Sequence, residues 1–370
     1  MKSSVCLNMI VRNEASIIKR CLSSIKPWID TWVISDTGST DGTQDVIRDF
    51  MKDIPGQLIE TPWVDFAHNR NIALDAARST ADYALFIDAD QQFVPNEGFY
   101  GFDLVNGSYS IHVTEPTLYK SCSTAYFLLR NNQPLAWKGV LHEYLADADG
   151  PSKDGELFLG GSILSITQDG YRSRDTEKYL KDAKVLEQAL LDEPWNARYM
   201  FYLGQSYTNA HIYDLALTAF EKRSTTDSTD AGENFFSRFM VGILQETLGF
   251  SQDTCLESFL KAHEYRPSRQ EPVYKIGQIY MSRGEYQNAY DLLKSYVFNY
   301  NLDDQYLIQA NIRDYLLPIL YSNACFKLKN YEECYCVLKK ICSLNSLPEH
   351  LEKIAKQDIA YLKSQIPYLS

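Results

Sequence analysis

The sequence predicts an α/β domain followed by an all-α domain of helical repeats. With 370 residues the chain exceeds one ordinary hydrophobic core, so two domains are expected. Up to about residue 165, short β-rich runs alternate with helical patterns. From Arg174 onward the periodicity is helical almost throughout, and an internal repeat appears. A hydrophobic content of 45% and an aromatic content of 13% exclude a largely disordered chain.

The α/β part contains three strand-helix units and a fourth strand. Short runs of β-forming residues predict strands at 5–11, 31–35, 57–60 and 83–87. Apolar residues at helical spacing predict helices at 14–25, 41–51 and 66–77, and Ser39, Thr40 and Asp41 are cap candidates for the second. Further β-rich segments follow at 108–113, 125–130, 135–144 and 157–166. A sheet of this kind binds ligands beyond the carboxyl ends of its strands.

The all-α part carries a repeated set of small and large residues. Gly204, Tyr207, Ala216 and Phe220 have offsets of 3, 12 and 16 from the first residue, and the same offsets recur at Gly277, Tyr280, Ala289 and Leu293. A third copy, with one inserted residue, uses Gly242, Gln245, Cys255 and Phe259, and a degraded fourth uses Ser322, Cys325, Cys334 and Leu338. These positions match a tetratricopeptide repeat. We expect four helix pairs between 197 and 347, with a linking helix at 176–191 that Pro194 ends.

Composition limits the kinds of partner that the protein is expected to bind and the cell compartment in which it is expected. A formal charge of −12 argues against a surface for nucleic acid, because phosphate contacts need clustered Lys and Arg. The apolar run near the N-terminus is too short for a signal peptide, and no transmembrane segment is predicted. The eight cysteines are scattered, so we interpret them as reduced thiols and expect a cytoplasmic protein.

Three motifs in the first part carry chemistry. The segment 35–43 follows a strand and contains Asp36 and two glycines, which suit either a nucleoside contact or a simple capped turn. Arg70 lies on a predicted helix, where it can reach a base or a diphosphate, or remain a solvated charge. Strand alternation would place Asp88 and Asp90 on one side of a strand end, where they can share Mn²⁺ or Mg²⁺.

Four ordered segments, at 9–15, 35–43, 66–71 and 87–90, resemble glycosyltransferase family 2, the inverting GT-A enzymes that use nucleotide-diphosphate sugars. Later segments at 199–207, 216–223 and 266–272 resemble the branch of that family with C-terminal tetratricopeptide repeats. The resemblance implies a GT-A glycosyltransferase domain at 1–170, a linking helix at 171–195 and tetratricopeptide-like helical repeats at 196–370.

The resemblance also implies roles for individual residues. Asp36 and Asp88 are expected to contact the nucleoside, Arg70 to help hold the base, and Asp90 to bind the metal ion. The donor-binding residues implied by the matching motifs are Val11, Asn13, Glu14, Asp36, Arg70, Asp88 and Ala89.

The segment 137–144 resembles a Trp-x-Gly-x-x-His-Glu run of the same branch. His142 would be a further metal ligand or a diphosphate contact, and Glu143 the general base that takes the acceptor proton, with Asp147 and Asp169 as other candidates. The alternative is a strand-end His beside a solvent-facing Glu. Adjacent strand residues face opposite ways, so both can serve one pocket only if the strand is bulged.

Two positions depart from the family pattern. Gln91 stands where this branch commonly has an acid, and Gln168 stands where a histidine is expected before the Gly-Tyr pair. Gln91 removes one charge near the metal, and Gln168 predicts weaker metal binding or the use of Asp169 instead of the histidine.

The function predicted from the sequence is a metal-dependent, inverting glycosyltransferase, with a UDP-sugar as donor and a glycan, peptide or protein as acceptor. The repeats would bind a protein partner or a second copy of the chain. The alternative is a scaffold protein whose GT-A domain is catalytically weakened. A nucleotidyltransferase is disfavoured, because Arg12, Asn13 and Glu14 make a poor triphosphate loop.

Overall fold

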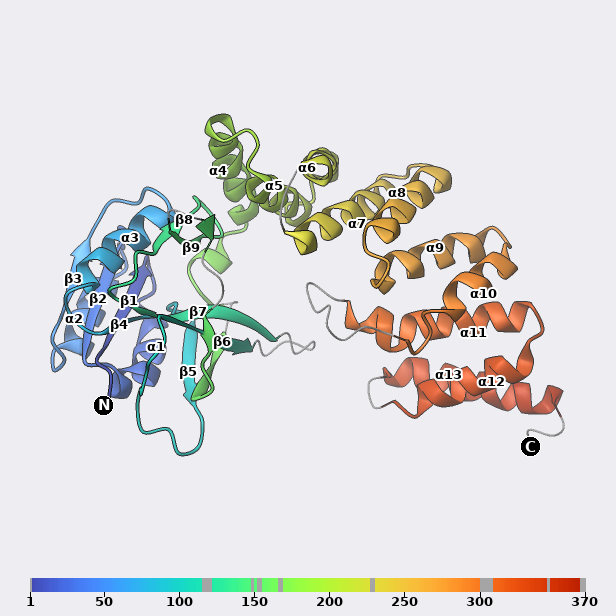
Figure 1. Ribbon diagram of the computed structural model, residues 1–370, viewed down its shortest axis with the longest axis horizontal. Coiled ribbons are helices and arrows are strands. Elements are labelled where there is room, and N and C mark those ends of the chain that lie inside the picture. The colour runs from blue at the N-terminus through green and yellow to red at the C-terminus, as the bar shows by residue number, and fades with distance from the viewer. Residues whose placement is uncertain are drawn as a thin grey trace. The chain divides into compact units, whose positions relative to one another are not determined.

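The computed structural model describes residues 2–114, 122–147, 150–151, 155–165, 169–226, 230–299, 309–344 and 347–366. The chain divides into two compact units, Met1–Ala189 and Leu190–Ser370 (Figure 1). The helix predicted as a link is α4 (Lys178–Asp192), and most of it belongs to the first unit. Within the described residues, no helix combines the length and apolar character needed to cross a bilayer.

The first unit is built on a nine-stranded mixed sheet with the order β3-β2-β1-β4-β7-β6-β12-β5, and β11 pairs with β6. The first four strands run parallel, whereas β7 is antiparallel to both β4 and β6. The strand bounds are β1 Val5–Val11, β2 Thr31–Asp36, β3 Gly56–Glu60, β4 Tyr83–Phe86, β5 Gln91–Pro95, β6 Ser108–Thr114, β7 Cys122–Arg130, β11 Glu156–Leu157 and β12 Gly161–Ser165. Parallel strands covered on both faces are apolar throughout, and β1 and β2 are buried along almost their whole length.

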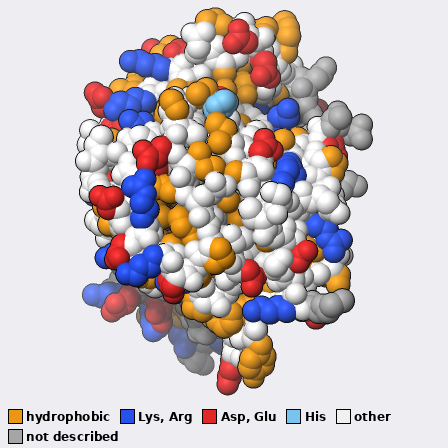
Figure 2. Space-filling model, turned by 90° about the vertical axis from the view of Figure 1, so that its left-hand side faces the viewer, with side chains coloured by type: hydrophobic (Ala, Val, Ile, Leu, Met, Phe, Trp, Pro, Cys, Tyr) orange, Lys and Arg blue, Asp and Glu red, His pale blue; other side chains and the backbone are white. Residues whose placement is uncertain are grey.

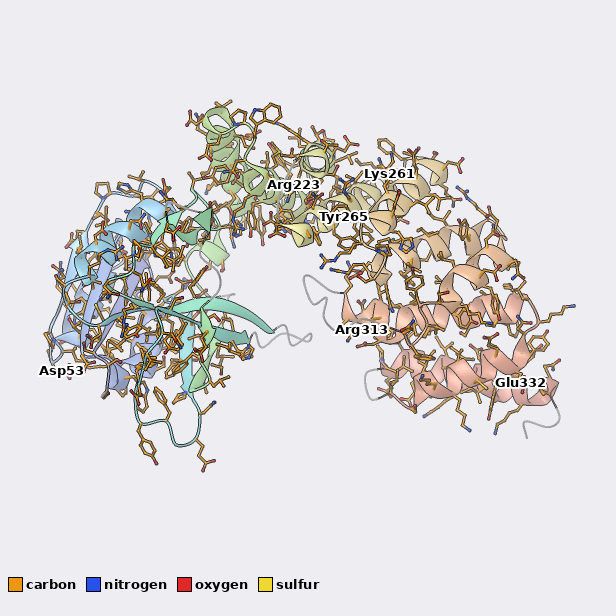
Figure 3. All side chains as sticks on the ribbon, in the orientation of Figure 1. Asp53, Arg223, Lys261, Tyr265, Arg313 and Glu332 are labelled. Atoms are coloured by element: carbon orange, nitrogen blue, oxygen red, sulfur yellow. The ribbon has the colours of Figure 1, made fainter. Side chains whose placement is uncertain are left out.

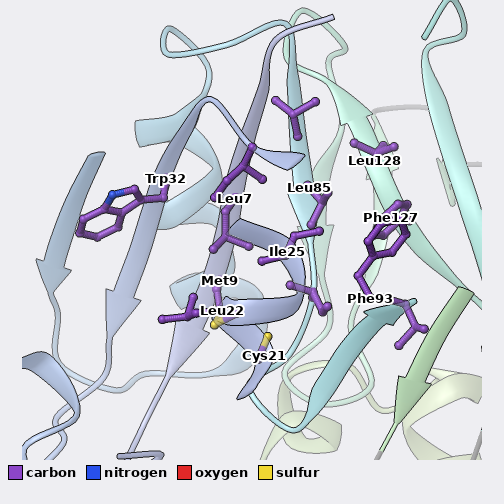
Figure 4. Close-up of a cluster of buried hydrophobic side chains, with 14 of the residues drawn as sticks. Leu7, Met9, Cys21, Leu22, Ile25, Trp32, Leu85, Phe93, Phe127 and Leu128 are labelled. Carbon is purple, nitrogen blue, oxygen red and sulfur yellow. The ribbon is translucent and has the colours of Figure 1, made fainter. Parts of the chain in front are cut away.

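Helices α1 (Ile18–Ile25), α2 (Thr43–Met51) and α3 (Phe66–Ala77) connect the parallel strands, and η1 (Lys26–Trp28) extends α1. Helix α1 buries Ile18, Cys21, Leu22 and Ile25, which recur at helical spacing. Figure 4 shows Cys21, Leu22 and Ile25 with Leu7 and Met9 of β1 and Leu85 of β4, and Phe93 and Phe127 continue the same core at β5 and β7.

The predicted helix at 14–25 begins four residues later than expected. Residues 13–15 instead donate their backbone N–H groups to side chains of the β2–α2 loop, in contacts of Asn13 with Ser39 Oγ (2.8 Å), Glu14 with Thr43 Oγ1 (2.9 Å) and Ala15 with Asp41 Oδ2 (3.0 Å). The residue at the N-cap of α2 is Gly42, in the left-handed region. The cap candidates Ser39 and Asp41 therefore hold the neighbouring loop, although Asp41 Oδ1 also accepts from Thr43 N.

Three strand predictions were wrong in part, and one of them, at 157–166, covers two separate strands, β11 and β12. Strand β4 stops at Phe86, so Asp88 and Asp90 lie in a turn rather than on one side of a strand. The predicted strand at 135–144 is two strands, β8 (Ala136–Lys138) and β9 (Tyr144–Asp147), which pair in a small sheet with β10 (Gly150–Pro151). Gly139 and His142 lie between β8 and β9, and both have positive φ. The chain reverses direction in this turn.

The second unit is a series of antiparallel helix pairs, as predicted. Its described helices are α5 Ala197–Asn209, α6 Tyr213–Thr225, α7 Ala231–Thr247, α8 Gln252–Tyr265, α9 Gln270–Ser282, α10 Tyr286–Lys294, α11 Leu317–Lys327, α12 Tyr331–Cys342 and α13 Glu349–Gln365, and a π-helical turn, η3 (Ile312–Leu316), leads into α11. In Figure 3 the side chain of Arg223 lies among these helices; it is fully buried and pairs with Glu233.

The repeated small and large residues meet across the first three helix pairs. A Cβ placed on Gly204 would lie 2.8 Å from the ring of Phe220, and one on Gly242 would lie 2.5 Å from the ring of Phe259. For Gly277 the nearest atom would belong to Leu293, at 3.0 Å. The small residue of the first helix is therefore the contact point for the large residue of the second, which confirms the predicted repeat.

Candidate active site

A cavity of about 400 Å³ lies beyond the carboxyl ends of β1, β2 and β4. One side comes from the strand ends, with Val11, Thr37 and Asp88 to Asp90, and another from α3 and the loop before it, with Trp63, Phe66 and Arg70. Val140 and Leu141 of the β8–β9 turn line it too, as do residues between Gly170 and Val185. All of these residues belong to the first unit.

Asp36 lies at the end of β2, next to Thr37 of the cavity wall, and is almost fully buried. Its Oδ1 accepts hydrogen bonds from Gly38 N (3.0 Å), Ser39 N (2.8 Å) and Gln44 Nε2 (3.1 Å). Its Oδ2 is buried and has no hydrogen-bond partner among the described residues. An unpaired buried carboxylate oxygen is costly, so this atom is a candidate acceptor for a donor group of a ligand.

The turn after β4 presents Asp88 and Asp90 to the cavity. Asp88 N donates to the side-chain oxygen of Gln91 (3.0 Å), and Gln91 N donates to the carbonyl of Asp88 (3.0 Å). Gln91, the residue that departs from the family pattern, therefore holds this turn in shape. Ala89, between the two acids, is buried and also lines the cavity.

Asp90 and Glu14 are two acids of the cavity whose pKa values are raised above the ordinary range. Burial, reinforced by the charge of Asp88, raises the pKa of Asp90 to about 6. Burial also raises the pKa of Glu14 to about 7, and the charge of Asp90 adds to this rise. The hydrogen bond that the Glu14 carboxylate accepts from Tyr171 N (3.1 Å) opposes it. Each carboxylate is short of positive charge in this structure.

Arg70 joins two of the predicted site residues. Its Nε donates to Glu143 Oε1 (2.5 Å), its Nη2 donates to Asp88 Oδ1 (3.0 Å), and its guanidinium lies on the ring of Trp137. Burial opposes the charge of Arg70, but Asp88 and Glu143 outweigh it, so the pKa of Arg70 is raised. The side chains of Arg70 and Glu143 are only 12% and 13% exposed. Arg70 therefore connects the turn after β4 to Glu143.

The β8–β9 turn carries His142 and Glu143. Asn71 of α3 fixes its start by accepting from Trp137 N (2.8 Å) and donating to Trp137 O (2.9 Å). His142 is exposed, has a φ of 53° and does not line the cavity, whereas Glu143 points to Arg70. These neighbours thus lie in a turn rather than on a bulged strand, and Glu143 contacts a residue that lines the cavity.

The structure therefore brings most of the predicted residues to one cavity. Val11, Glu14, Arg70, Asp88, Ala89 and Asp90 line it, whereas Asn13, Asp36, His142 and Glu143 do not. Asn13 has a φ of 55° and its Oδ1 accepts from Thr40 N (2.8 Å), which makes it part of the loop framework. Gln168 lies outside the described residues. Asp169, an alternative base, forms a bidentate pair with Arg20 (2.6 and 3.1 Å).

The charge of the cavity suits a divalent cation. Its lining contains six acidic and four basic side chains, a formal surplus of two negative charges. Carboxylate oxygens are the ligands that Mn²⁺ and Mg²⁺ prefer, and a cation beside Asp90 would stabilise the ionised carboxylate that burial and Asp88 disfavour. Among the described residues no group of three or more His, Cys, Asp or Glu side chains could form a complete metal site. Asp90, with Asp88 nearby, would therefore need further ligands from the substrate or water.

Comparison with known proteins identifies the domain that holds this cavity. Residues 6–100 match the model of glycosyl transferase family 2. The N-terminal domain belongs to this family. The family 2 domain thus includes β1 to β4 and the turn with Asp88 and Asp90.

Two curated relatives resemble different parts of the chain. The SPbeta prophage-derived glycosyltransferase SunS of Bacillus subtilis is 26% identical over 227 residues, which cover 57% of this chain and 50% of SunS. A TPR repeat-containing protein of Synechococcus elongatus is 39% identical over 93 residues, which cover 25% of this chain and 22% of that protein. The chain thus spans half or less of the length of these relatives.

Solved structures that resemble part of the chain include MamA and YrrB. MamA has a TM-score of 0.37 and 17% identity, and the match covers 50% of this chain and 97% of MamA. YrrB, described as a TPR protein with an unusual peptide-binding site, has a TM-score of 0.36 and 15% identity over 49% of this chain and 84% of its own.

Proposed function

We propose that this chain is a metal-dependent, inverting glycosyltransferase that moves a sugar from a UDP-sugar to a hydroxyl of a glycan or protein. The observation that carries the proposal is the cavity of the family 2 domain, where Asp88 and Asp90 lie close to Thr37 and the buried Asp36. A nucleotide-diphosphate sugar is the donor that such a cavity, with a divalent cation, would bind.

The hydrogen bonds of Asp36 favour uracil as the base. Because Oδ1 already accepts three hydrogen bonds, only Oδ2 remains for a ligand. Uracil offers one N–H on its pairing edge, which matches one free oxygen. Guanine offers an adjacent N–H and NH₂, a pair that needs both carboxylate oxygens. The backbone N–H of Thr61 donates to the Asp36 carbonyl (2.9 Å), which brings the segment before α3 next to Asp36. Trp63, two residues further on, lines the cavity and supplies an aromatic surface for a base.

In the proposed reaction the acceptor oxygen attacks the anomeric carbon as the bond to the diphosphate breaks. A general base takes the hydroxyl proton, and the diphosphate leaves with the bonding electrons. Asp90, helped by Asp88, would hold Mn²⁺ or Mg²⁺, which neutralises charge on the leaving group when it is bound. Glu143 remains our proposed base, with Oε2 as the oxygen that Arg70 does not engage in the structure.

The direct test is a panel of nucleotide sugars with purified protein and Mn²⁺, with release of the nucleoside diphosphate as the readout. UDP with Mn²⁺ should raise the melting temperature by mass action, and Asp90→Ala should remove that shift. No shift with any nucleoside diphosphate would contradict the proposal.

The second candidate is a scaffold protein with a weakened glycosyltransferase domain. The observation that favours it is the Arg70–Glu143 pair, since one oxygen of the proposed base is already engaged by a guanidinium. Glu143→Gln should keep UDP binding and lose transfer if Glu143 is the base. A wild-type protein that binds UDP but turns over no donor, with or without added acceptors, would support the scaffold.

We also propose that the repeat unit binds an acceptor protein, a partner or a second copy of the chain, since helical repeats offer extended binding surfaces. A cytoplasmic location is supported by the cysteines, because the seven whose side chains the structure describes are free thiols. On the face seen in Figure 2, acidic and basic side chains are interspersed, unlike the basic field that nucleic acid binding requires.

A further inference from the structure

One wall of the cavity is formed by residues far outside the 6–100 segment that matches family 2. It comprises the turn η2 (Arg172–Arg174), its neighbours and the first half of α4. The cavity residues on this wall are Gly170, Tyr171, Arg172, Ser173, Asp175, Lys181, Asp182 and Val185. The segment predicted as a link is therefore part of the candidate active site.

This wall is fixed to the start of α1 by several polar contacts. Glu14 accepts from Tyr171 N, and Arg20 pairs with Asp169 through two hydrogen bonds (2.6 and 3.1 Å). Arg174 donates to the carbonyl of Asp169 (3.0 Å) and to Ser16 Oγ (3.2 Å). These contacts hold the segment against the residues that line the donor end of the cavity.

Gly170 brings the wall close to the predicted metal ligand. A Cβ at this position would lie 3.4 Å from Asp90 Oδ2 and 3.7 Å from Glu14 Oε1. The side chains that follow Gly170 are thus near the place where a cation on Asp90 would meet the diphosphate.

Arg172 is the cation of this wall whose side chain is held in place by neighbouring side chains. Its guanidinium lies 4.6 Å from the centre of the Phe66 ring and pairs with Asp182, while its own side chain remains 37% exposed. The Asp182 carboxylate is more enclosed, with 12% of its side chain exposed. An aromatic ring on one face and a buried carboxylate at one edge orient the planar guanidinium and leave its other N–H groups for a ligand.

Lys178 adds a second positive charge nearby. Burial and the charge of Arg172 lower the pKa of its ammonium group, and Asp182 and Asp90 oppose that effect. Lys178 forms no ion pair with any residue that the structure describes. Lys178 lies four residues before Asp182 on α4, so the two side chains share one face of the helix.

We propose that Arg172 binds the diphosphate of the donor and stabilises it as the leaving group, with Lys178 of α4 as a second positive charge near it. The proposal rests on the proposed function and assigns a phosphate-binding role to the segment between the family 2 domain and the repeats. A guanidinium offers two parallel N–H groups to phosphate oxygens, and lysine offers a compact charge. With a metal ion on Asp90, these cations would add further positive charge around the diphosphate.

The test compares UDP and uridine, which share a base and ribose and differ in the diphosphate. Calorimetric titrations with Mn²⁺ present would use the full-length wild type, Arg172→Gln, Arg172→Lys and Lys178→Gln. Lys184→Gln is the matched control, because Lys184 is an exposed residue of α4 that does not line the cavity. Arg172→Gln should weaken UDP binding about tenfold to hundredfold, the loss typical of a charged hydrogen bond, and leave uridine binding unchanged.

The remaining variants grade the effect. Arg172→Lys should recover part of the UDP affinity because it keeps the charge without the two parallel donors. Unchanged UDP binding by Arg172→Gln and Lys178→Gln would overturn the proposal, as would an equal loss of UDP and uridine binding, which indicates a structural role. Wild-type protein that binds no nucleoside diphosphate would instead overturn the proposed function, and with it this inference.

Discussion

At the scale of single residues, the site consists of acids whose environments differ. Asp36 is buried and holds a loop through one oxygen, whereas Asp88 shares Arg70 with Glu143. Asp90 and Glu14 are raised in pKa because they are enclosed near other acids. Equal residue types therefore have unequal roles, and each role suggests a different experiment.

Asp36→Asn tests whether the unpaired oxygen recognises a base. The amide oxygen can still hold the loop, but an NH₂ group would replace Oδ2 and meet the ligand's N–H donor. We expect UDP binding to weaken about tenfold to hundredfold by calorimetry, the range of a lost charged hydrogen bond. Asp45→Asn, at an exposed carboxylate of α2, is the control and should bind UDP like the wild type. Equal UDP binding by both variants would rule out Asp36 as a base contact.

Glu14 should make the metal-free protein less stable as the pH rises. Its pKa is about 7 in the folded protein against 4.5 in an ordinary setting, so its stabilising effect is fully present below pH 4.5 and is lost as the pH rises through 7. Glu14→Gln resembles the protonated acid and can still accept from Tyr171 N. In urea unfolding we expect the variant to exceed the wild type by about 1–2 kcal/mol at pH 8, after screening, and to equal it at pH 4.

A stability difference between wild type and Glu14→Gln that stays constant from pH 4 to pH 8 would show that Glu14 is not the group responsible. Glu177→Gln, at an exposed residue near the start of α4, is the control and should not alter the pH profile.

At the scale of elements, α3 organises the cavity through three consecutive residues. Asn69 accepts from Val64 N (3.0 Å) and donates to Thr61 Oγ1 (3.1 Å), which fixes the loop before the helix. Arg70 holds the turn after β4, and Asn71 holds Trp137 at the start of the β8–β9 turn. A motif expected to contact the donor therefore serves largely to place three loops that line the cavity.

In the repeat unit, packing between paired helices predicts that a Gly→Ala substitution destabilises a helix that it would ordinarily stabilise. Ala normally stabilises a helix relative to Gly by about 0.5–1 kcal/mol. Gly242→Ala should instead destabilise it by about 1–3 kcal/mol, because the new methyl group would overlap Phe259. Gly277→Ala should cost less, since its nearest neighbour, Leu293, lies 3.0 Å away.

Chemical unfolding of the two glycine variants and of Gly242→Ala/Phe259→Leu would measure this coupling. The smaller side chain in the double variant should recover part of the lost stability. Stabilisation by Gly242→Ala alone would contradict the proposed contact.

At the scale of the whole molecule, the boundary of the catalytic unit lies inside α4. Every residue that lines the cavity belongs to Met1–Ala189, including the wall between Gly170 and Val185. A fragment of residues 1–192 should therefore keep the melting-temperature increase that UDP and Mn²⁺ cause, whereas a fragment of residues 1–169 should lose it. Thermal shift measurements on the two fragments and the full chain provide the comparison. Equal ligand shifts in both fragments would show that the wall takes no part in binding.

The sequence by itself determined the order of the elements and the kind of fold. Its apolar runs located β1 to β4 and α3, because parallel strands and amphipathic helices need those patterns locally. The spacing of glycines and large residues also located the helix pairs, since each pair must bury the same contact. Ordered polar motifs at the strand ends pointed to the edge of the sheet where the cavity lies.

Only the tertiary structure decided what those polar residues contact. Partners such as Glu143 for Arg70, Asp169 for Arg20 and Tyr171 N for Glu14 are separated by 73, 149 and 157 positions. No local pattern encodes such pairs, because they depend on how turns and helices pack. For the same reason the wall with Arg172 went unrecognised: its residues have no motif of their own, and their significance comes from lying beside Asp90.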